Sequence, residues 1–231
     1  MKMVSDFHSY ARPNEAKVTH LDWKAEVNFD SREITGTATY TIEKAEDAER
    51  IVFDVRELRI DSVVTSDGGA VPFELGPEDQ FLGQPLNIPI TAATKTVSIS
   101  YASAPGAEAL LWVEGEYPFL FTQSQAILAR TWLPCQDSPG IRFTYNAEVT
   151  VPDGLMALMS AENPKEMNDS NMYTFKMEQP IPSYLMALAV GNVEFRAIGD
   201  RTGVYATPDV IEAAEYEFQE MDDMLIAAEE L

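Results

Sequence analysis

Strict alternation of apolar and polar residues near the start of the chain limits its fold more than any other feature. From Leu21 to Phe29 every second residue is apolar, and charged or amide residues stand between them. A turn-like segment, Asp30–Glu33, separates this run from a second one, Ile34–Ile42, in which threonine occupies each intervening position. A period of two places alternate side chains on opposite faces of a strand. The two runs therefore predict an antiparallel hairpin with one buried face.

Short β-like runs continue to about residue 200, separated by turn signals and prolines rather than by long helices. Proline cannot donate to a sheet ladder, so it marks strand ends. The expected strands are 51–55, 59–65, 97–101, 119–121, 143–151 and 173–177, with 184–190 and 193–197 as further candidates. Closely spaced strands of this kind predict a mainly β fold, in which antiparallel sheets pack as a sandwich.

The pattern changes at Thr207, which suits a helix N-cap and is followed by Pro208 at the first helical position. Apolar residues then recur at steps of three and four, which predicts one C-terminal α-helix of about six turns over 208–231. The stripe consists of Ile211, Ala214, Phe218, Met221, Leu225 and Ala228. Either this helix packs on its own domain, or it opens a second domain. The lack of a glycine or proline stop favours the second interpretation.

Charge and cysteine usage restrict the partners. The 231 residues include 38 acids and 16 bases, a formal net charge of -22. Such a surface repels nucleic acid and anionic lipid, so neither is expected as a partner. The single cysteine, Cys135, excludes an intrachain disulfide and fits a reducing, cytoplasmic location. No signal peptide or membrane-spanning run is visible, although a removed presequence would leave no trace.

The chain carries no recognisable catalytic motif. Its only histidines are His8 and His20, so the His-Glu-x-x-His zinc motif is absent, and both are expected to be surface or packing residues. Phosphate-binding loops and the Gly-x-Ser-x-Gly elbow are also absent. We therefore expect no catalytic residue and no metal ligand within these 231 residues.

Two amide side chains follow the predicted strand at 119–121. In an extended chain Gln123 and Gln125 point to the same side, where paired amides offer donors and acceptors to the polar end of a peptide. Ordinary solvent-facing strand residues would give the same pattern. A cation–π contact between Arg130 and Trp132 is disfavoured, because neighbouring residues in an extended strand point apart.

Several segments resemble zinc aminopeptidases of the leukotriene A4 hydrolase type, a family related to aminopeptidase N. The segments, in chain order, are Phe119–Ala126, Leu133–Pro139, Pro180–Leu188, Ile198–Thr202 and Tyr216–Glu229. The resemblance implies that 1–207 is an N-terminal β saddle domain. It also implies that 208–231 is the first helix of a truncated zinc-peptidase catalytic domain. The zinc ligands and the catalytic glutamate would then lie beyond Leu231.

The resemblance also assigns a substrate-binding role to Gln123, Ser124 and Gln125. Gln125 would help to hold the free α-amine of a peptide beside a glutamate of the missing domain, and Gln123 would line the same pocket. Many relatives place glutamate at the position of Gln125, and glutamine lacks that charge. Pro134–Asp137 is expected to be structural, with Cys135 as a small buried hydrophobe and Asp137 tying a loop.

The implied function is release of N-terminal residues from peptides by a zinc-dependent full-length enzyme. This domain would supply a substrate-binding wall, with the downstream catalytic domain and the substrate N-terminus as its partners, and would be inactive alone. Two alternatives stay open. One is a non-catalytic β-sandwich that serves as a binding or scaffold module, since fold does not fix function. The other is an inactive relative with degenerate zinc ligands.

Overall fold

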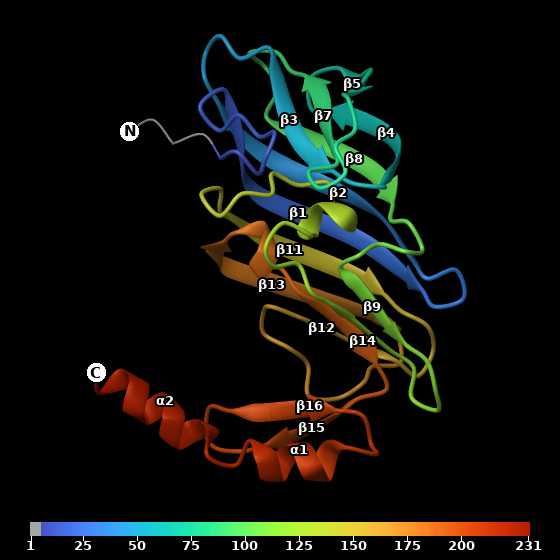
Figure 1. Cartoon of the computed structure of the whole chain (residues 1–231), viewed down its shortest axis with the longest axis vertical. Helices are drawn as coiled ribbons and strands as arrows, with labels where there is room; N and C mark the ends of the chain where they lie inside the picture. Colours follow the sequence, from blue (N-terminus) through green and yellow to red (C-terminus); the bar gives the residue numbers. More distant parts are fainter. Residues whose placement is uncertain (1–5) are drawn as a thin grey trace.

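A computed structural model describes residues 6–231, and its strands form a tall, mainly β body with two helices at one end (Figure 1). The strands are β1 (Ala16–Asn28), β2 (Glu33–Lys44), β3 (Arg50–Val55), β4 (Arg59–Thr65), β5 (Gly69–Ala70), β6 (Glu74–Leu75), β7 (Gln84–Pro89), β8 (Thr96–Ala102), β9 (Leu110–Val113), β10 (Phe119–Thr122), β11 (Phe143–Thr150), β12 (Met156–Met159), β13 (Met172–Ile181), β14 (Leu188–Gly191), β15 (Glu194–Ala197) and β16 (Gly203–Ala206). The helices are η1 (Ala129–Thr131), η2 (Ser183–Leu185), α1 (Ile211–Glu217) and α2 (Met221–Glu229).

The largest layer is a seven-stranded sheet in the order β13-β11-β1-β2-β8-β4-β5. The predicted hairpin is confirmed, because β1 and β2 pair antiparallel and place Trp23 opposite Ala38 on the buried face. The mainly β fold with antiparallel sheets is also confirmed, with one exception, since β1 pairs with β11 in parallel. Alternation fixes which face of a strand is buried but carries no information about the direction of its partner.

Two smaller sheets pack on the inner face of the large one. They are a four-stranded sheet, β12-β14-β10-β9, and a three-stranded sheet, β3-β7-β6. Aromatic rings link the layers: Trp23 meets Trp132 edge-on with ring centroids 5.5 Å apart, and Tyr40 meets Phe53 at 5.0 Å. Each fully buried ring of this kind contributes about 1.5–3 kcal/mol through lost water contact. The sheets therefore share one continuous core.

The C-terminal helical segment lies where the sequence places it, but it is divided into α1 and α2 instead of forming one run. Val210, and not Thr207, occupies the N-cap of α1, while the Thr207 hydroxyl donates to Asp209. The break has a physical cause. The segment holds four pairs of acids three residues apart, at 209/212, 212/215, 217/220 and 220/223, and like charges at this spacing repel along a helix. Asp222, meanwhile, accepts hydrogen bonds from the turn between β15 and β16.

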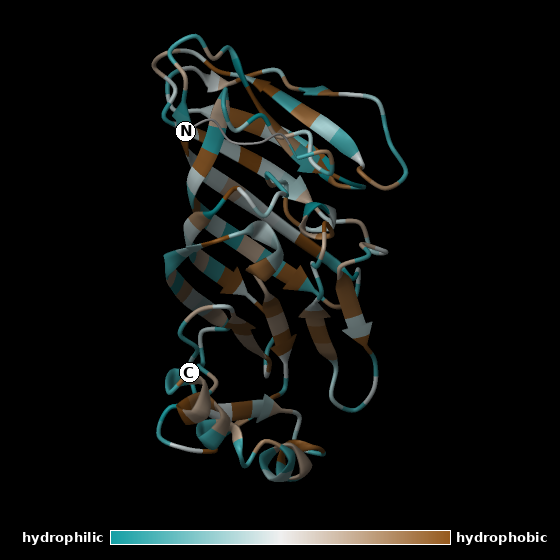
Figure 2. Cartoon of the chain, turned by 60° about the vertical axis from the view of Figure 1, so that its left-hand side comes forward, coloured by the Kyte–Doolittle hydropathy of each residue, from teal (hydrophilic) through white to brown (hydrophobic). Residues whose placement is uncertain are grey.

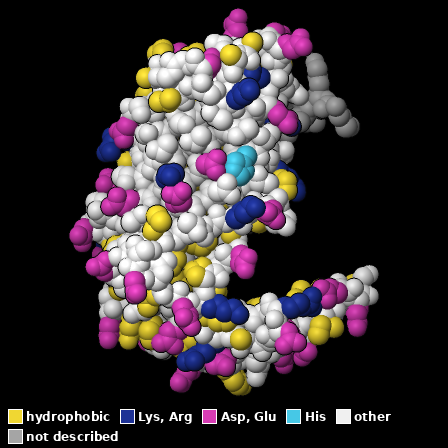
Figure 3. Space-filling view, turned by 180° about the vertical axis from the view of Figure 1, so that it is seen from behind, with side chains coloured by type: hydrophobic (Ala, Val, Ile, Leu, Met, Phe, Trp, Pro, Cys, Tyr) yellow, Lys and Arg dark blue, Asp and Glu magenta, His cyan; other side chains and the backbone are white. Residues whose placement is uncertain are grey.

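The end of the chain forms a unit of its own. The hairpin of β15 and β16 pairs with neither the large nor the four-stranded sheet, and α1 packs on it. Arg201 in the hairpin turn makes a two-pronged ion pair with Glu229 of α2. Seen from behind, a hollow separates the helical end from the body (Figure 3). Neither helix, nor any other in residues 6–231, combines the length and apolarity that crossing a bilayer requires.

Candidate functional site

The loop that follows β10 carries the three residues to which the resemblance gives a substrate-binding role. The backbone N–H of Gln123 donates to the Ala109 carbonyl over 2.9 Å, so the ladder between β9 and β10 extends one step past Thr122. Beyond that point the chain turns. Gln123 and Gln125 are exposed, whereas Ser124 is only 3% exposed. The loop therefore presents two amides outward and one hydroxyl inward.

The relation between the two glutamines differs from the extended-chain expectation. The Gln125 backbone N–H donates to the Gln123 side-chain oxygen over 3.1 Å, and the Gln125–Ala126 peptide bond is cis. Within residues 6–231 the side-chain amide of Gln125 makes no hydrogen bond, so both its donor and its acceptor face solvent. Gln123 keeps its NH₂ group for an external partner, because its oxygen is engaged by the loop backbone.

Ser124 anchors this loop to the core. Its hydroxyl accepts a hydrogen bond of 3.0 Å from the buried indole N–H of Trp132, and its carbonyl accepts one from the Leu128 backbone. A buried indole without an acceptor would lose the free energy of its hydrogen bond to water. Ser124 therefore fixes the direction of the two glutamines on either side of it.

A buried ionic cluster lies directly after the glutamine loop in the chain and fixes the segment that follows it. The guanidinium of Arg130 donates to Asp137 at 3.1 Å and lies 3.9 Å from Asp54, and none of these side chains is more than 1% exposed. The same guanidinium donates to the backbone carbonyls of Leu82 and His8. Arg130 is thus fully paired here and not stacked over Trp132, in agreement with the weak expectation for a cation–π contact.

Asp54 on β3 completes the cluster. Its carboxylate accepts hydrogen bonds from the Ser9 hydroxyl and from the backbone of Tyr10 and Asp137. Burial raises the pKa of Asp54, while Arg130 and these hydrogen bonds oppose that shift. Three segments far apart in the chain therefore meet at one carboxylate: the N-terminal segment, β3 and the link between β10 and β11.

The structural role expected for Pro134–Asp137 is confirmed. Gln136 donates to the carbonyls of Ala16 and Val52 and accepts from the backbone of Val18, all buried. The Asp137 carboxylate ties η2 to the cluster through the Ser183 hydroxyl, 2.6 Å away. Burial raises the pKa of the Cys135 thiol well above its ordinary value, and Asp137 and Asp54 add to that shift.

The two histidines lie apart, as surface and packing residues. His8 is exposed, and its carbonyl accepts from Arg130. His20 lies on the outer face of the large sheet, where a ring nitrogen meets the Thr144 hydroxyl at 2.6 Å. In residues 6–231 no three His, Cys, Asp or Glu side chains converge as metal ligands would.

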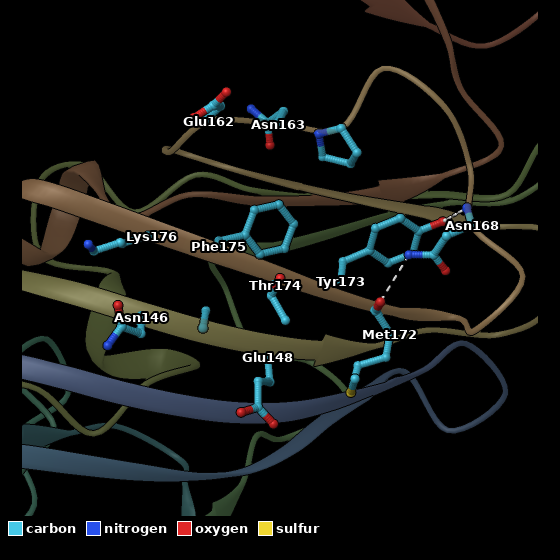
Figure 4. A pocket seen from close by; sticks show the side chains of 12 residues that line it. Asn146, Glu148, Glu162, Asn163, Asn168, Met172, Tyr173, Thr174, Phe175 and Lys176 are labelled. Carbon is cyan, nitrogen blue, oxygen red and sulfur yellow. Dashed lines mark hydrogen bonds between the residues drawn. The ribbon is translucent and has the colours of Figure 1, made fainter.

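A separate cavity of about 630 Å³ was not foreseen from the sequence. It runs along the free edge of β13, between that strand and the 162–168 loop, and Figure 4 shows its lining side chains. Asn168 fastens the loop, because its side-chain N–H donates to the Met172 carbonyl and its backbone N–H to the Tyr173 hydroxyl. Asn146, Glu148 and Lys176 line the other side. None of Gln123, Ser124 or Gln125 contributes to this cavity.

Comparison with known proteins places the chain in a family. The family model described as "Peptidase M1 N-terminal domain" matches residues 17–185. Leukotriene A-4 hydrolase of Xenopus laevis is 37% identical over 245 residues, covering 99% of this chain and 40% of that protein. Leucine aminopeptidase 2-1 of Scheffersomyces stipitis is 33% identical, covering 94% of this chain and 35% of its own length. The chain therefore spans less than half of these relatives.

Solved structures agree with this placement. Native yeast LTA4 hydrolase superposes with a TM-score of 0.88 at 28% identity, over 98% of this chain and 37% of that chain. The M1 zinc metallopeptidase from Deinococcus radiodurans gives a TM-score of 0.65 at 22% identity, a likeness that shows the fold alone. The family model spans the chain from β1 to η2 and so includes the glutamine loop. This chain belongs to the M1 peptidase family, and its residues 17–185 match the N-terminal domain of that family.

Proposed function

We propose that the chain is the N-terminal part of a zinc-dependent aminopeptidase and forms one wall of its substrate pocket. The observation that carries this proposal is the glutamine loop, in which two outward amides stand on a buried, fully paired support. The relatives named as leukotriene A-4 hydrolase and leucine aminopeptidase support the choice of reaction. A preorganised wall fixes the position of a peptide end relative to reacting groups elsewhere.

Residues 6–231 do not fit a zinc site of their own. His8 and His20 are separated, and no three His, Cys, Asp or Glu side chains cluster in residues 6–231. A zinc ion in the longer protein would be held by residues outside this chain, and the present domain is proposed to be inactive alone. Its contribution is binding and orientation, with the substrate N-terminus and the following catalytic domain as partners.

Gln125 is the residue proposed to meet the substrate. Its side-chain oxygen accepts hydrogen bonds, so it suits the ammonium group of a peptide N-terminus. Gln123 lends its NH₂ group to the same pocket, and Ser124 contributes by holding the loop through Trp132. Because a neutral amide carries no charge, this contact supplies one ordinary hydrogen bond, worth about 0.5–1.5 kcal/mol.

The boundary between domains is proposed to lie between Gly191 and Glu194, ahead of the expected position at 207. The hairpin of β15 and β16 pairs only with itself and carries α1, so it belongs with the helical end. The family model, which ends at residue 185, is compatible with this division. A cytoplasmic location is also proposed, since the lone thiol of Cys135 is buried and unpaired.

Kinetics of the longer protein on aminoacyl amides test the proposed role. Gln125→Ala should raise KM about three- to tenfold and leave kcat nearly unchanged, as expected for loss of one ground-state hydrogen bond. Gln125→Glu should lower KM by restoring a charge. Gln80→Ala, which removes an exposed glutamine from a turn outside the site, is the control. Unchanged KM in both Gln125 variants would refute the wall role.

A further inference from the structure

His20 and its neighbours form a compact group of polar atoms on the outer face of the large sheet. The strands of this sheet are striped in Figure 2, because polar residues on the outer face alternate with apolar residues that face the core. His20 and Asp22 lie two residues apart on β1. The parallel register places Thr144 of β11 beside His20, and Asn146 beside Asp22. The four side chains therefore share one face, although 124 residues separate Asn146 from Asp22 in the chain.

Three polar atoms of this group lie at the corners of a triangle. The Asn146 amide nitrogen is 3.2 Å from His20 Nε2 and 2.9 Å from Asp22 Oδ1, and the last two atoms are 3.4 Å apart. The amide donates to both, so its partly positive hydrogens already stand between a ring lone pair and a carboxylate. When the amide turns over, its oxygen takes the place of the nitrogen, and three acceptor atoms face one point.

The imidazole ring of His20 is held in the tautomer that a metal ligand requires. Its Nε2 accepts from Asn146, so Nδ1 carries the proton and donates to the Thr144 hydroxyl over 2.6 Å. Histidines that ligate metals in proteins almost always donate their second ring N–H to a partner of this kind, which fixes the ring. The free Nε2 lone pair therefore has a set direction before any ion binds.

The spacing of the three atoms fits a six-coordinate divalent ion. Ligands at about 2.1–2.3 Å from such an ion lie about 3.0–3.3 Å from one another, and the three edges here are 2.9, 3.2 and 3.4 Å. One imidazole with two oxygens suits Mn²⁺ better than zinc, whose structural sites take four protein ligands. The side chains of His20 and Asp22 are 28% and 56% exposed, so water can complete the coordination.

We propose that His20, Asp22 and Asn146 bind one divalent transition cation of the Mn²⁺ class on the outer face of the large sheet. The formal net charge of -22 raises the concentration of cations near the surface of the chain. A bound ion links β1 to β11, the parallel pair at the middle of the sheet. The inference is independent of the proposed peptidase function, because none of these residues belongs to the glutamine loop.

His8 provides a comparison within the same chain. Its Nδ1 also lies 3.4 Å from a carboxylate oxygen, that of Asp6, which is two residues earlier. The His8 side chain is 73% exposed, and its ring makes no hydrogen bond to a threonine or amide side chain within residues 6–231. This second pair therefore has the same His–Asp distance as the first, but it lacks the third donor and the anchored ring.

Broadening of histidine NMR signals by Mn²⁺ tests the site, because the chain has only two histidines. The 231-residue chain with isotope-labelled histidine rings is titrated with MnCl₂, and His8→Gln assigns the two sets of ring signals. The His20 signals should broaden at a Mn²⁺ concentration at least about tenfold below that needed for His8. Ca²⁺ at the same concentration should not reverse the broadening, since Ca²⁺ takes oxygen ligands. Equal broadening of the two histidines overturns the site.

Two substitutions separate a metal site from a surface hydrogen-bond network. Asn146→Ala removes the third donor, and Thr144→Val keeps all three donors but removes the acceptor of the Nδ1 proton. Each should raise the Mn²⁺ concentration needed to broaden the His20 signals by about tenfold or more. Thr150→Val, on the same face of β11, is the matched control and should leave the titration unchanged. Urea unfolding checks that each variant folds, and an unchanged titration in a folded Asn146→Ala or Thr144→Val chain overturns the proposal.

Discussion

The outer faces of the seven-stranded sheet and of the four-stranded sheet differ in the polarity of their side chains. On the large sheet the outward residues are mostly polar, and many satisfy one another: Thr39 pairs with Ser98 at 2.8 Å, and Lys24 with Glu148 at 3.0 Å. Val64 is an exposed apolar exception. Seen from behind, the side chains over this sheet are mostly neither hydrophobic nor charged (Figure 3). On the four-stranded sheet Leu111, Val113 and Phe121 are exposed on the outer face, while Met156 on the same face is buried. The first face is mostly polar, and the second exposes apolar side chains.

The two outer faces contribute differently to the stability of this domain. Lateral hydroxyl pairs on the large sheet contribute a fraction of a kcal/mol each, about 0.2–1, and need nothing above them. The exposed apolar side chains of the four-stranded sheet gain stability only when something removes them from water, at about 25 cal/mol per Å² covered. The four-stranded sheet therefore leaves some apolar area in contact with water, whereas the large sheet pairs many of its outward polar groups with one another.

The largest effect is expected from breaking the buried cluster of Arg130, Asp54 and Asp137, which ties β3 of the three-stranded sheet to the link between β10 and β11. Arg130→Met leaves Asp54 and Asp137 as unpaired buried charges, so it should destabilise the 231-residue chain by about 3–5 kcal/mol. Urea unfolding measures this loss. Arg142→Met removes an exposed arginine and should change stability by less than about 0.5 kcal/mol. Equal effects of the two substitutions would contradict the supporting role of the cluster.

Neighbouring residues on β10 sharpen the contrast between inner and outer faces. Leu120→Ala opens a cavity in the core and should cost about 2–5 kcal/mol, because Leu120 is fully buried. Phe121→Ala removes a larger side chain from the uncovered face and should cost less than about 1 kcal/mol in the same chain. Thermal or urea unfolding of both variants makes the comparison. A larger loss for Phe121→Ala would mean that residues 6–231 cover that face themselves.

The smallest effect is expected on the outer face of the large sheet. Thr39→Ala deletes the hydroxyl paired with Ser98 and should cost about 0.2–1 kcal/mol. Thr35 lies on the same face of β2, four residues before Thr39, and its hydroxyl makes no hydrogen bond within residues 6–231. Thr35→Ala is therefore the matched control. The difference between the two variants isolates the hydroxyl pair. If Thr39→Ala lowered the free energy of unfolding by more than about 2 kcal/mol, the hydroxyl pair would contribute more to stability than a lateral pair on a solvent-exposed sheet face.

Much of the fold was predictable because local patterns decide it. The hairpin of β1 and β2, strand β4 and the strands near 97–101 and 143–151 follow from alternation and turn residues. The partner of β1 was not predictable, since a period of two is the same beside a parallel or an antiparallel neighbour. The break between α1 and α2 also escaped, because it depends on Asp222 bonding to a turn about twenty residues earlier.

The candidate site was only partly predictable. Gln123 and Gln125 were selected by resemblance, and the structure places both outward, but the inward turn of Ser124 depends on the Trp132 indole eight residues later. The apolar outer face had a signal in the sequence. Leu110–Val113 and Phe119–Phe121 are nearly continuous apolar runs, which indicate strands buried on both sides.

The parallel pairing of β1 with β11 has a consequence for how the polypeptide is made. His20 lies beside Thr144, 124 residues later, so one flank of β1 stays open until β11 has left the ribosome. Local hairpins form as the chain emerges, while this long-range closure is slow. Biosynthesis thus passes through a stage in which an unpaired strand edge at the middle of the future sheet is offered to chaperones or to other nascent chains.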